Sequence, residues 1–148
     1  MVFVPHSEYF EGVLQLRNPS EELIDFVIST VKKDDRAAIT KIVQEPGGPD
    51  YYITDQKYLQ ILGKKLRARF AGEFKMTSTL HTQRKDGKKL YRITILFRQY
   101  TFKAGDMVLV DGEEHEVMRI ENNQISVKSV KSGKKSRVPP DRVSVVRA

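Results

Sequence analysis

The residues best suited to chemistry in this 148-residue chain are its histidines and the carboxylates near them. Glu113 and His115 alternate along a β-type run and therefore share one face, which makes them conceivable metal ligands. No third ligand accompanies them at a suitable spacing, and the alternative interpretation is an acidic strand edge. His6 lies in the first residues, and His81 follows Leu80 in a β-type run where a packed or half-exposed histidine is commoner than a general base. We predict no metal site and no catalytic residue.

Other motifs for nucleophilic or phosphate chemistry are missing from the sequence. Gly47-Gly48 precedes a β-type run and lacks the Lys-Ser/Thr that follows the glycines of a phosphate loop. The serines have no nucleophile-elbow context, and the chain has no cysteine for a thiolate, a disulfide or a zinc ligand. We predict that the protein is not an enzyme, binds no cofactor and has no small-molecule substrate.

Basic side chains gather at three places whose geometry suits phosphate binding. One is the exposed face of a predicted helix, where a merely solvated surface is an equally good interpretation. The other two are predicted hairpin tips, around Asp86-Gly87 and around Ser132-Gly133, where phosphate contact is favoured. The candidate RNA-binding residues are Lys57, Lys64 and Arg67 on the helix, Arg84, Lys85, Lys88 and Lys89 at the first tip, and Lys131, Lys134, Lys135 and Arg137 at the second.

Four tyrosines add possible stacking partners for RNA bases. They are Tyr51, Tyr52, Tyr91 and Tyr100. RNA recognition often uses aromatic side chains as platforms for unpaired bases. All four lie in or beside β-type runs, so packing in a hydrophobic core is the favoured alternative.

The first part of the chain combines five β-type runs with two amphipathic helices. The runs cover residues 9–17, 39–45, 51–54, 73–82 and 89–99, and Pro46-Gly47-Gly48-Pro49-Asp50 separates the second from the third. The resulting order is β-α-β-β-α-β-β, an α+β sandwich of an antiparallel sheet and two helices.

The helix limits follow from capping residues and apolar spacing. Asn18 is a candidate cap for the first helix, with Pro19 at its first position and Glu21 completing a capping box, and the helix should end near residues 33–35. Thr54 or Asp55 caps the second helix, which should end near residues 71–72. The second helix has an apolar stripe formed by Leu59, Leu62, Leu66 and Phe70.

After residue 100 the helical signal disappears. Five short β-type runs, at 107–110, 113–120, 124–129, 136–138 and 143–146, alternate with turn sequences. This pattern is typical of a small SH3-like or oligonucleotide-binding-type barrel. We therefore predict two domains, residues 1–100 and residues 101–148, with the boundary near residues 99–103.

Composition excludes some classes of protein and locates the charge. With 39% hydrophobic and 30% charged residues, the chain is too apolar for disorder and too polar for a membrane protein, and its N-terminus does not read as a signal peptide. The absence of cysteine is compatible with a reducing cytoplasmic setting. The net charge of +7 is uneven: residues 1–54 carry −4, residues 55–100 carry +9 and residues 122–148 carry +6. On charge alone, the basic blocks suit a phosphate-bearing partner and a merely solvated surface equally well.

Three groups of residues resemble a known family. They are residues 9–18, the run Gly47-Gly48-Pro49-Asp50-Tyr51-Tyr52-Ile53-Thr54-Asp55, and Tyr91-Arg92-Ile93-Thr94 leading to Phe102 and Gly105-Asp106. Their order and spacing resemble the ribosome-associated family named for nonsense-mediated decay, whose eukaryotic members are large-subunit export adaptors (the NMD-three proteins). The resemblance implies a factor that binds the intersubunit face of a late, immature large ribosomal subunit.

The resemblance also implies a fold for each part of the chain. Residues 1–100 are expected to resemble a small ribosomal-protein fold, and residues 101–148 the SH3-like domain of the hypusine-bearing elongation factor. The turn at Glu121-Asn122-Asn123, where that factor carries its modified lysine, has no lysine here. A role of that kind in peptidyl transfer is therefore not expected.

The sequence departs from the family at its ends. It lacks the N-terminal zinc region with its paired Cys-x-x-Cys motifs, and it shows no leucine-rich export signal or basic import signal. We expect an archaeal-type, cytoplasmic protein.

The predicted function is a ribosome-associated RNA-binding factor that acts on the large ribosomal subunit during late maturation or quality control. Its partners would be rRNA and ribosomal proteins, without a membrane. The alternative is a protein-interaction scaffold whose acidic surfaces dock basic ribosomal proteins without direct RNA contact. The acidic residues 1–54 and the run Glu113-Glu114-His115-Glu116 motivate that alternative.

Overall fold

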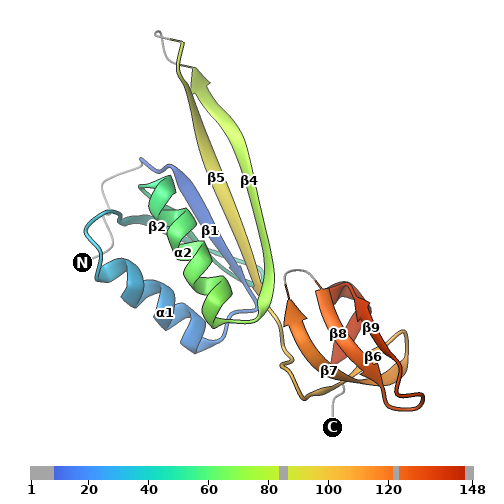
Figure 1. Cartoon of the computed structure of the whole chain (residues 1–148). Helices are drawn as coiled ribbons and strands as arrows, with labels where there is room; N and C mark the ends of the chain where they lie inside the picture. Colours follow the sequence, from blue (N-terminus) through green and yellow to red (C-terminus); the bar gives the residue numbers. More distant parts are fainter. Residues whose placement is uncertain (1–8, 84–86, 122–123, 146–148) are drawn as a thin grey trace. The chain divides into compact units, whose positions relative to one another are not determined.

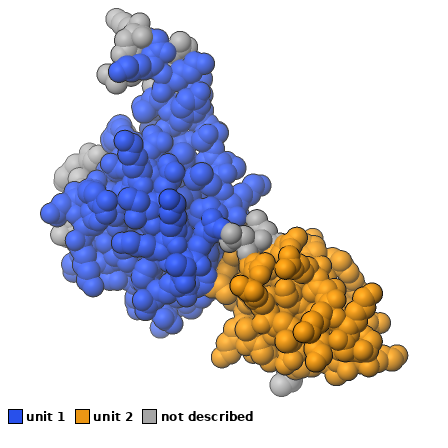
Figure 2. Space-filling view, in the orientation of Figure 1, with its two compact units in different colours: residues 1–70, 74–99 blue, residues 71–73, 100–148 orange. Residues whose placement is uncertain are grey.

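The computed structural model describes residues 9–83, 87–121 and 124–145. The chain divides into two compact units (Figure 2): unit 1 comprises residues 1–70 and 74–99, and unit 2 comprises residues 71–73 and 100–148. No helix in the described ranges has the length and apolar character needed to cross a bilayer. Two helices and two five-stranded sheets confirm the predicted α+β class.

Unit 1 is built on a mixed sheet in the order β2-β3-β1-β5-β4 (Figure 1). Its strands are β1 (Gly12–Arg17), β2 (Ile39–Glu45), β3 (Gly48–Ile53), β4 (Gly72–Gln83) and β5 (Lys89–Gln99). β1 pairs antiparallel with β3 but parallel with β5, from Gly12 opposite Ile93 to Arg17 opposite Arg98.

The prediction of a purely antiparallel sheet is therefore wrong. Hairpin connections can be read from the sequence because they join neighbouring runs. The β1–β5 pair instead joins strands separated by both helices, and that connection is long enough to bring the chain back in the same direction.

Both helices cover one face of this sheet and enclose the core of unit 1 (Figure 1). α1 (Glu21–Lys32) buries Leu23, Val27 and Val31, and α2 (Gln56–Arg69) buries a stripe that faces β1 and β5. Leu59, Leu62 and Leu66 of the predicted α2 stripe are fully buried, whereas Phe70 is half-buried at the edge of the core. The predicted helical periodicity is thus confirmed in three dimensions.

The first helix is capped by a different residue from the one predicted. Ser20 is the N-cap, and its hydroxyl accepts a hydrogen bond from the Leu23 N–H at 3.1 Å. Asn18 lies two residues earlier with a positive φ of 53°, and its side-chain amide donates to the Gln99 carbonyl at 3.2 Å. Asn18 therefore ties the chain to β5 instead of capping α1. The N-cap of α2 is Asp55, one of the two residues predicted for that position.

The turn between β2 and β3 is tighter than its five-residue breaker sequence suggested. β3 begins at Gly48, so only Pro46 and Gly47 connect the strands. A Cβ on Gly48 would stand 2.2 Å from the Leu16 carbonyl oxygen, and its φ is +154°. Glycine is required here because the backbones of β1 and β3 approach closely.

Unit 2 is a second five-stranded sheet in the order β10-β6-β7-β8-β9. Its strands are β6 (Met107–Val110), β7 (Glu113–Glu121), β8 (Gln124–Ser129), β9 (Lys135–Val138) and β10 (Val143–Val145), and a short 3₁₀ turn, η1 (Pro140–Arg142), precedes β10. All its pairings are antiparallel. Within the described residues the order is linear and no β9–β10 pairing closes the sheet, so an SH3-like barrel stays a prediction.

Candidate nucleic-acid interface

The basic face of α2 is exposed as predicted. Lys57, Lys64 and Arg67 all point away from the core of unit 1. The Arg67 guanidinium lies over the Phe74 ring of β4, 4.7 Å from its centroid, which places this side of the helix next to β4. Gln56, in the first turn of α2, donates from its side-chain amide to the Tyr91 carbonyl of β5 at 3.3 Å. Between these two contacts, α2 runs along the β4–β5 pair.

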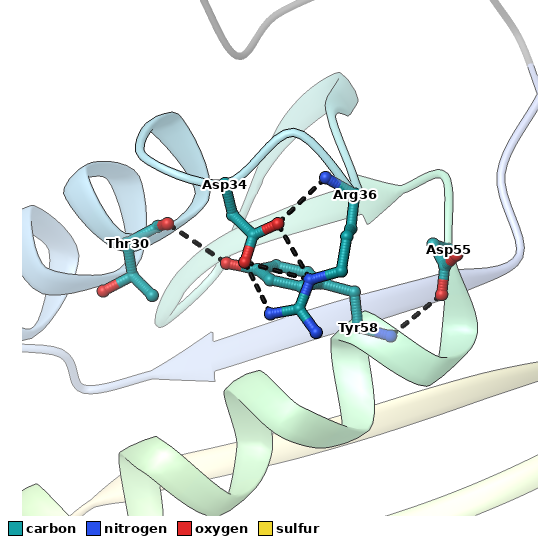
Figure 3. Close-up of polar contacts among 5 residues, drawn as sticks. All are labelled: Thr30, Asp34, Arg36, Asp55 and Tyr58. Atoms are coloured by element: carbon teal, nitrogen blue, oxygen red, sulfur yellow. Dashed lines mark hydrogen bonds and ion pairs between the residues drawn. The ribbon is translucent and has the colours of Figure 1, made fainter.

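A polar network fixes the start of α2 against the end of α1 (Figure 3). The Tyr58 hydroxyl donates to the Thr30 carbonyl at 3.1 Å, and the Asp55 carboxylate accepts from the Tyr58 N–H at 2.9 Å. Burial raises the pKa of Tyr58, so the hydroxyl keeps the proton that it donates. The network sets the position of α2, and with it the position of Lys57 one residue before Tyr58.

Arg36 completes this network from the connection between α1 and β2. Its guanidinium lies over the Tyr58 ring at 5.4 Å and pairs with the Asp34 carboxylate at 2.6 Å (Figure 3). Hydrogen bonds from the Arg36 side chain and backbone hold the pKa of Asp34 at about 2, below its ordinary 3.8. Arg36 therefore acts within the fold and is not part of a free basic surface.

The first predicted hairpin tip falls partly outside the described residues. Arg84 and Lys85 lie outside them, whereas Lys88 and Lys89 are exposed at the start of β5. Figure 1 shows β4 and β5 extending as a two-stranded ribbon past the helices. β1 pairs only with residues 93–98 of β5, so Lys89 lies on the part of the ribbon beyond β1.

The second predicted tip is an ordered turn between β8 and β9. The Gly133 N–H donates to the Ser129 carbonyl and the Ser129 N–H donates to the Lys134 carbonyl, both at 2.8 Å. The Ser129 hydroxyl also accepts from the Ser132 N–H at 3.2 Å. Gly133 has a positive φ of 74° within the turn. The exposed cations at the turn and at the start of β9 are Lys131, Lys134, Lys135 and Arg137.

A depression of about 320 Å³ lies beside this turn. Its lining combines Lys135 and Arg137, which were predicted, with Met118 and Ser126, which were not. Met118 is the unpaired residue where the β7–β8 register shifts between Val117 and Arg119, and it is 42% exposed. β-bulges re-aim side chains in this way. In the sequence, the one sign of this bulge is that Met118 directly follows the apolar Val117, which breaks the alternation of apolar and polar residues along β7.

Not all four cations of the β8–β9 turn stand in the same environment. Lys131 borders a depression of about 310 Å³ together with Glu113 and Glu114, so nearby carboxylates offset its charge. Lys135 lies opposite Lys128 in the strand register. Directly opposed like charges are unfavourable unless a counterion lies nearby. Glu116 of β7 lies opposite Lys128 on its other side and supplies a carboxylate to this row of charges.

Most of the candidate lysines have no acidic partner. In the described ranges, no ion pair engages Lys57, Lys64, Lys89, Lys131, Lys134 or Lys135. By contrast, Arg17 pairs with Asp50 at 2.8 Å and Arg119 with Glu121 at 3.2 Å. Exposed cations without a carboxylate nearby retain their attraction for phosphate, and this sets Lys131, beside Glu113 and Glu114, apart from the others.

The four tyrosines separate into core and surface positions. Tyr51 is buried, and Tyr100 packs on the core of unit 2, stacked on Phe102 at 5.0 Å. Burial raises the pKa of Tyr100 to about 12. Tyr52 is half-buried between the Phe10 ring and the Lys41 ammonium. Tyr91 is 42% exposed, and of these four tyrosines it alone is an exposed residue.

Glu113 and His115, the two conceivable metal ligands, are not joined by further ligands in the described residues. His115 is buried, and its Nδ1 lies 2.9 Å from the Glu113 carbonyl oxygen, while the Glu113 side chain is exposed. In the part of the chain that the structure describes, no three histidine or carboxylate side chains converge on one point.

Fold and surface together define an α+β protein of two units, whose candidate phosphate-binding cations lie on a helix, a ribbon and a hairpin turn. Residues 9–98 match the family model described as NMD3, second domain, and the chain belongs to this family. It is a family of ribosome-associated adaptors and not a known enzyme family. No curated protein matches the chain.

Proposed function

We propose that this protein binds the large ribosomal subunit through rRNA, in late maturation or quality control. The observation that carries the proposal is a set of exposed lysines without an acidic partner, on a chain of the NMD3 family. Among the candidate residues, these are Lys57, Lys64 and Lys89 in unit 1 and Lys134 and Lys135 in unit 2. Cations of this kind bind phosphates and release condensed counterions, which supplies affinity without a sequence-specific pocket.

The finer assignments belong to the same proposal. They are a cytoplasmic, archaeal-type factor, a unit 1 related to a small ribosomal protein, and an SH3-like unit 2. The antiparallel order of unit 2 supports the last of these. The matched model covers only the second domain of the family, so the missing zinc region stays a prediction.

The direct test is co-sedimentation of the protein with purified large subunits at low and moderate salt. We expect binding that weakens as salt rises. The double variant Lys134→Gln/Lys135→Gln should reduce the slope of log affinity against log salt by about 0.7 to 0.9 for each lysine that binds a phosphate in the parent protein. Lys32→Gln/Lys33→Gln is the matched control, because it removes two adjacent exposed lysines from the end of α1. Absence of binding at both salt concentrations contradicts the proposal.

A second candidate function, docking of basic ribosomal proteins, has its own observation. Glu21, Glu22 and Asp25 line a depression of about 630 Å³ on α1, which also contains Phe26. Arg69 and Lys33 lie in the same depression and offset part of the acidic charge. If this surface carries the function, ribosomal-protein capture survives nuclease treatment and is abolished in Glu21→Gln/Asp25→Asn. Loss of capture on nuclease treatment favours direct RNA binding.

A further inference from the structure

The β4–β5 ribbon has one face that a phosphate-binding role leaves unexplained. Phe74 of β4 and Ile95 of β5 both lie against α2, since a Cβ on Gly63 would meet each of them at 3.0 Å. Side chains alternate along a strand, so Met76, Ser78 and Leu80 share the Phe74 side, and Tyr91 shares the Ile95 side. We call this the helix-side face of the ribbon.

Large apolar side chains on this face are open to solvent. Met76 and Leu80 are each 51% exposed, and Tyr91 is 42% exposed. None of the three belongs to the core of unit 1 or packs at its margin. Large apolar side chains that share one exposed face are a candidate binding surface.

Cations border this face. On α2, Arg67 lies over Phe74, Lys64 lies about one turn before Arg67, and Lys57 lies about two turns before Lys64, both lysines being exposed. Lys57 and Arg67 are ten residues apart, a distance of about 15 Å along the helix axis. Lys89 stands two residues before Tyr91, on the same side of β5. An apolar and aromatic strip therefore runs beside a line of exposed positive charge.

We propose, on the basis of the proposed RNA-binding function, that this helix-side face binds unpaired RNA nucleotides. Bases lie against Tyr91, Met76 and Leu80, and the phosphates contact Lys57, Lys64 and Lys89. Base stacking on an aromatic ring needs an unstacked base, and a duplex does not offer one. The face therefore selects single-stranded or bulged rRNA over helical rRNA.

Charge decides against a second copy of the chain as the occupant. β4 is an edge strand, and edge strands are templates for strand addition. However, the described ribbon residues 75–83 and 87–92 include Lys75, Lys89 and Arg92 and not a single carboxylate. Pairing two such edges would bring like charges together, whereas RNA neutralises them.

The test measures binding of the full chain to a labelled mixed-sequence RNA of about 12 nucleotides, alone and annealed to its complement. We expect tighter binding to the single strand. Tyr91→Ala should weaken single-strand binding about 5- to 150-fold and leave duplex binding nearly unchanged. Tyr91→Phe, which keeps the ring, should bind like the parent. Leu80→Ala should weaken single-strand binding less than Tyr91→Ala.

Ile42→Ala is the matched control for Leu80→Ala, because Ile42 is 41% exposed on β2 at the opposite edge of the same sheet. Urea unfolding midpoints establish that each variant is folded. If Tyr91→Ala weakens single strand and duplex equally, or no more than Ile42→Ala, the assignment of this face is overturned while salt-dependent RNA binding stands. Absence of all RNA binding overturns both proposals. Concentration-dependent dimers that Leu80→Lys abolishes would assign the face to a second copy instead.

Discussion

Single residues show how this chain separates structural charge from surface charge. Arg17, Arg36 and Arg142 pair with Asp50, Asp34 and Asp111, and a guanidinium fork fits a carboxylate well. Lysine ammonium groups at Lys57, Lys64 and Lys135 stand exposed without such partners. A count of charges along the sequence does not distinguish these paired arginines from the unpaired lysines. Only the contacts in the structure show which cations are available to phosphate.

The Asp34–Arg36 pair makes a prediction about pH. Because Arg36 holds the pKa of Asp34 at about 2, below 3.8, its stabilising contribution is present above pH 3.8 and is lost as the pH falls toward 2. Asp34→Asn should therefore lower the urea midpoint at neutral pH, and its difference from the parent should shrink over that acidic range. Asp35→Asn, which removes the neighbouring exposed carboxylate, should leave the midpoint nearly unchanged at all these pH values. A constant Asp34→Asn difference across the range would show that charge is not the cause.

Among the elements, the helices could be predicted best. The ends of α2 and its buried leucine stripe follow from local spacing, because helical periodicity is a property of neighbouring residues. The cap of α1 could not be chosen from the sequence, since both Asn18 and Ser20 are good capping residues. The Gln99 side chain and carbonyl, which lie far along the chain, bond Ser20 and Asn18 respectively and decide between them.

The β2–β3 hairpin makes a prediction about stability. Gly48→Ala would place a Cβ 2.2 Å from the Leu16 carbonyl, a backbone atom that cannot move aside cheaply. We expect it to destabilise the protein by about 2 to 4 kcal/mol, measured by urea unfolding.

Gly133→Ala is the control for Gly48→Ala. Gly133 has a φ of +74° but nothing within 4 Å of the added Cβ, so only the backbone penalty of about 1 to 2 kcal/mol applies. Equal losses of stability in the two variants would show that the close approach of β1 and β3 adds nothing to the cost of Gly48→Ala.

At the scale of the whole molecule, both units carry candidate phosphate contacts, and this leads to a prediction of additivity. Neutralising Lys57, Lys64 and Lys89 in unit 1 should lower the salt slope by about 2. Neutralising Lys134 and Lys135 in unit 2 should lower it by about 1.5. Because the two sets lie in different compact units, their combination should lower the slope by roughly the sum. Large-subunit binding measured as a function of salt checks this, and a combined effect equal to either one alone would confine the contact to one unit.

The sequence by itself determined the α+β class, the two helices, the limits of most strands and the family resemblance, because periodicity, turn residues and motif order are local. Tertiary structure decided the parallel β1–β5 pairing, the need for glycine at position 48, the bulge that turns Met118 outward and the exposure of Tyr91. The β1–β5 pairing and the close approach at Gly48 depend on contacts between segments far apart in the chain, and the bulge depends on the register of β7 against β8. The free energies of these contacts cannot be read from any single window of residues.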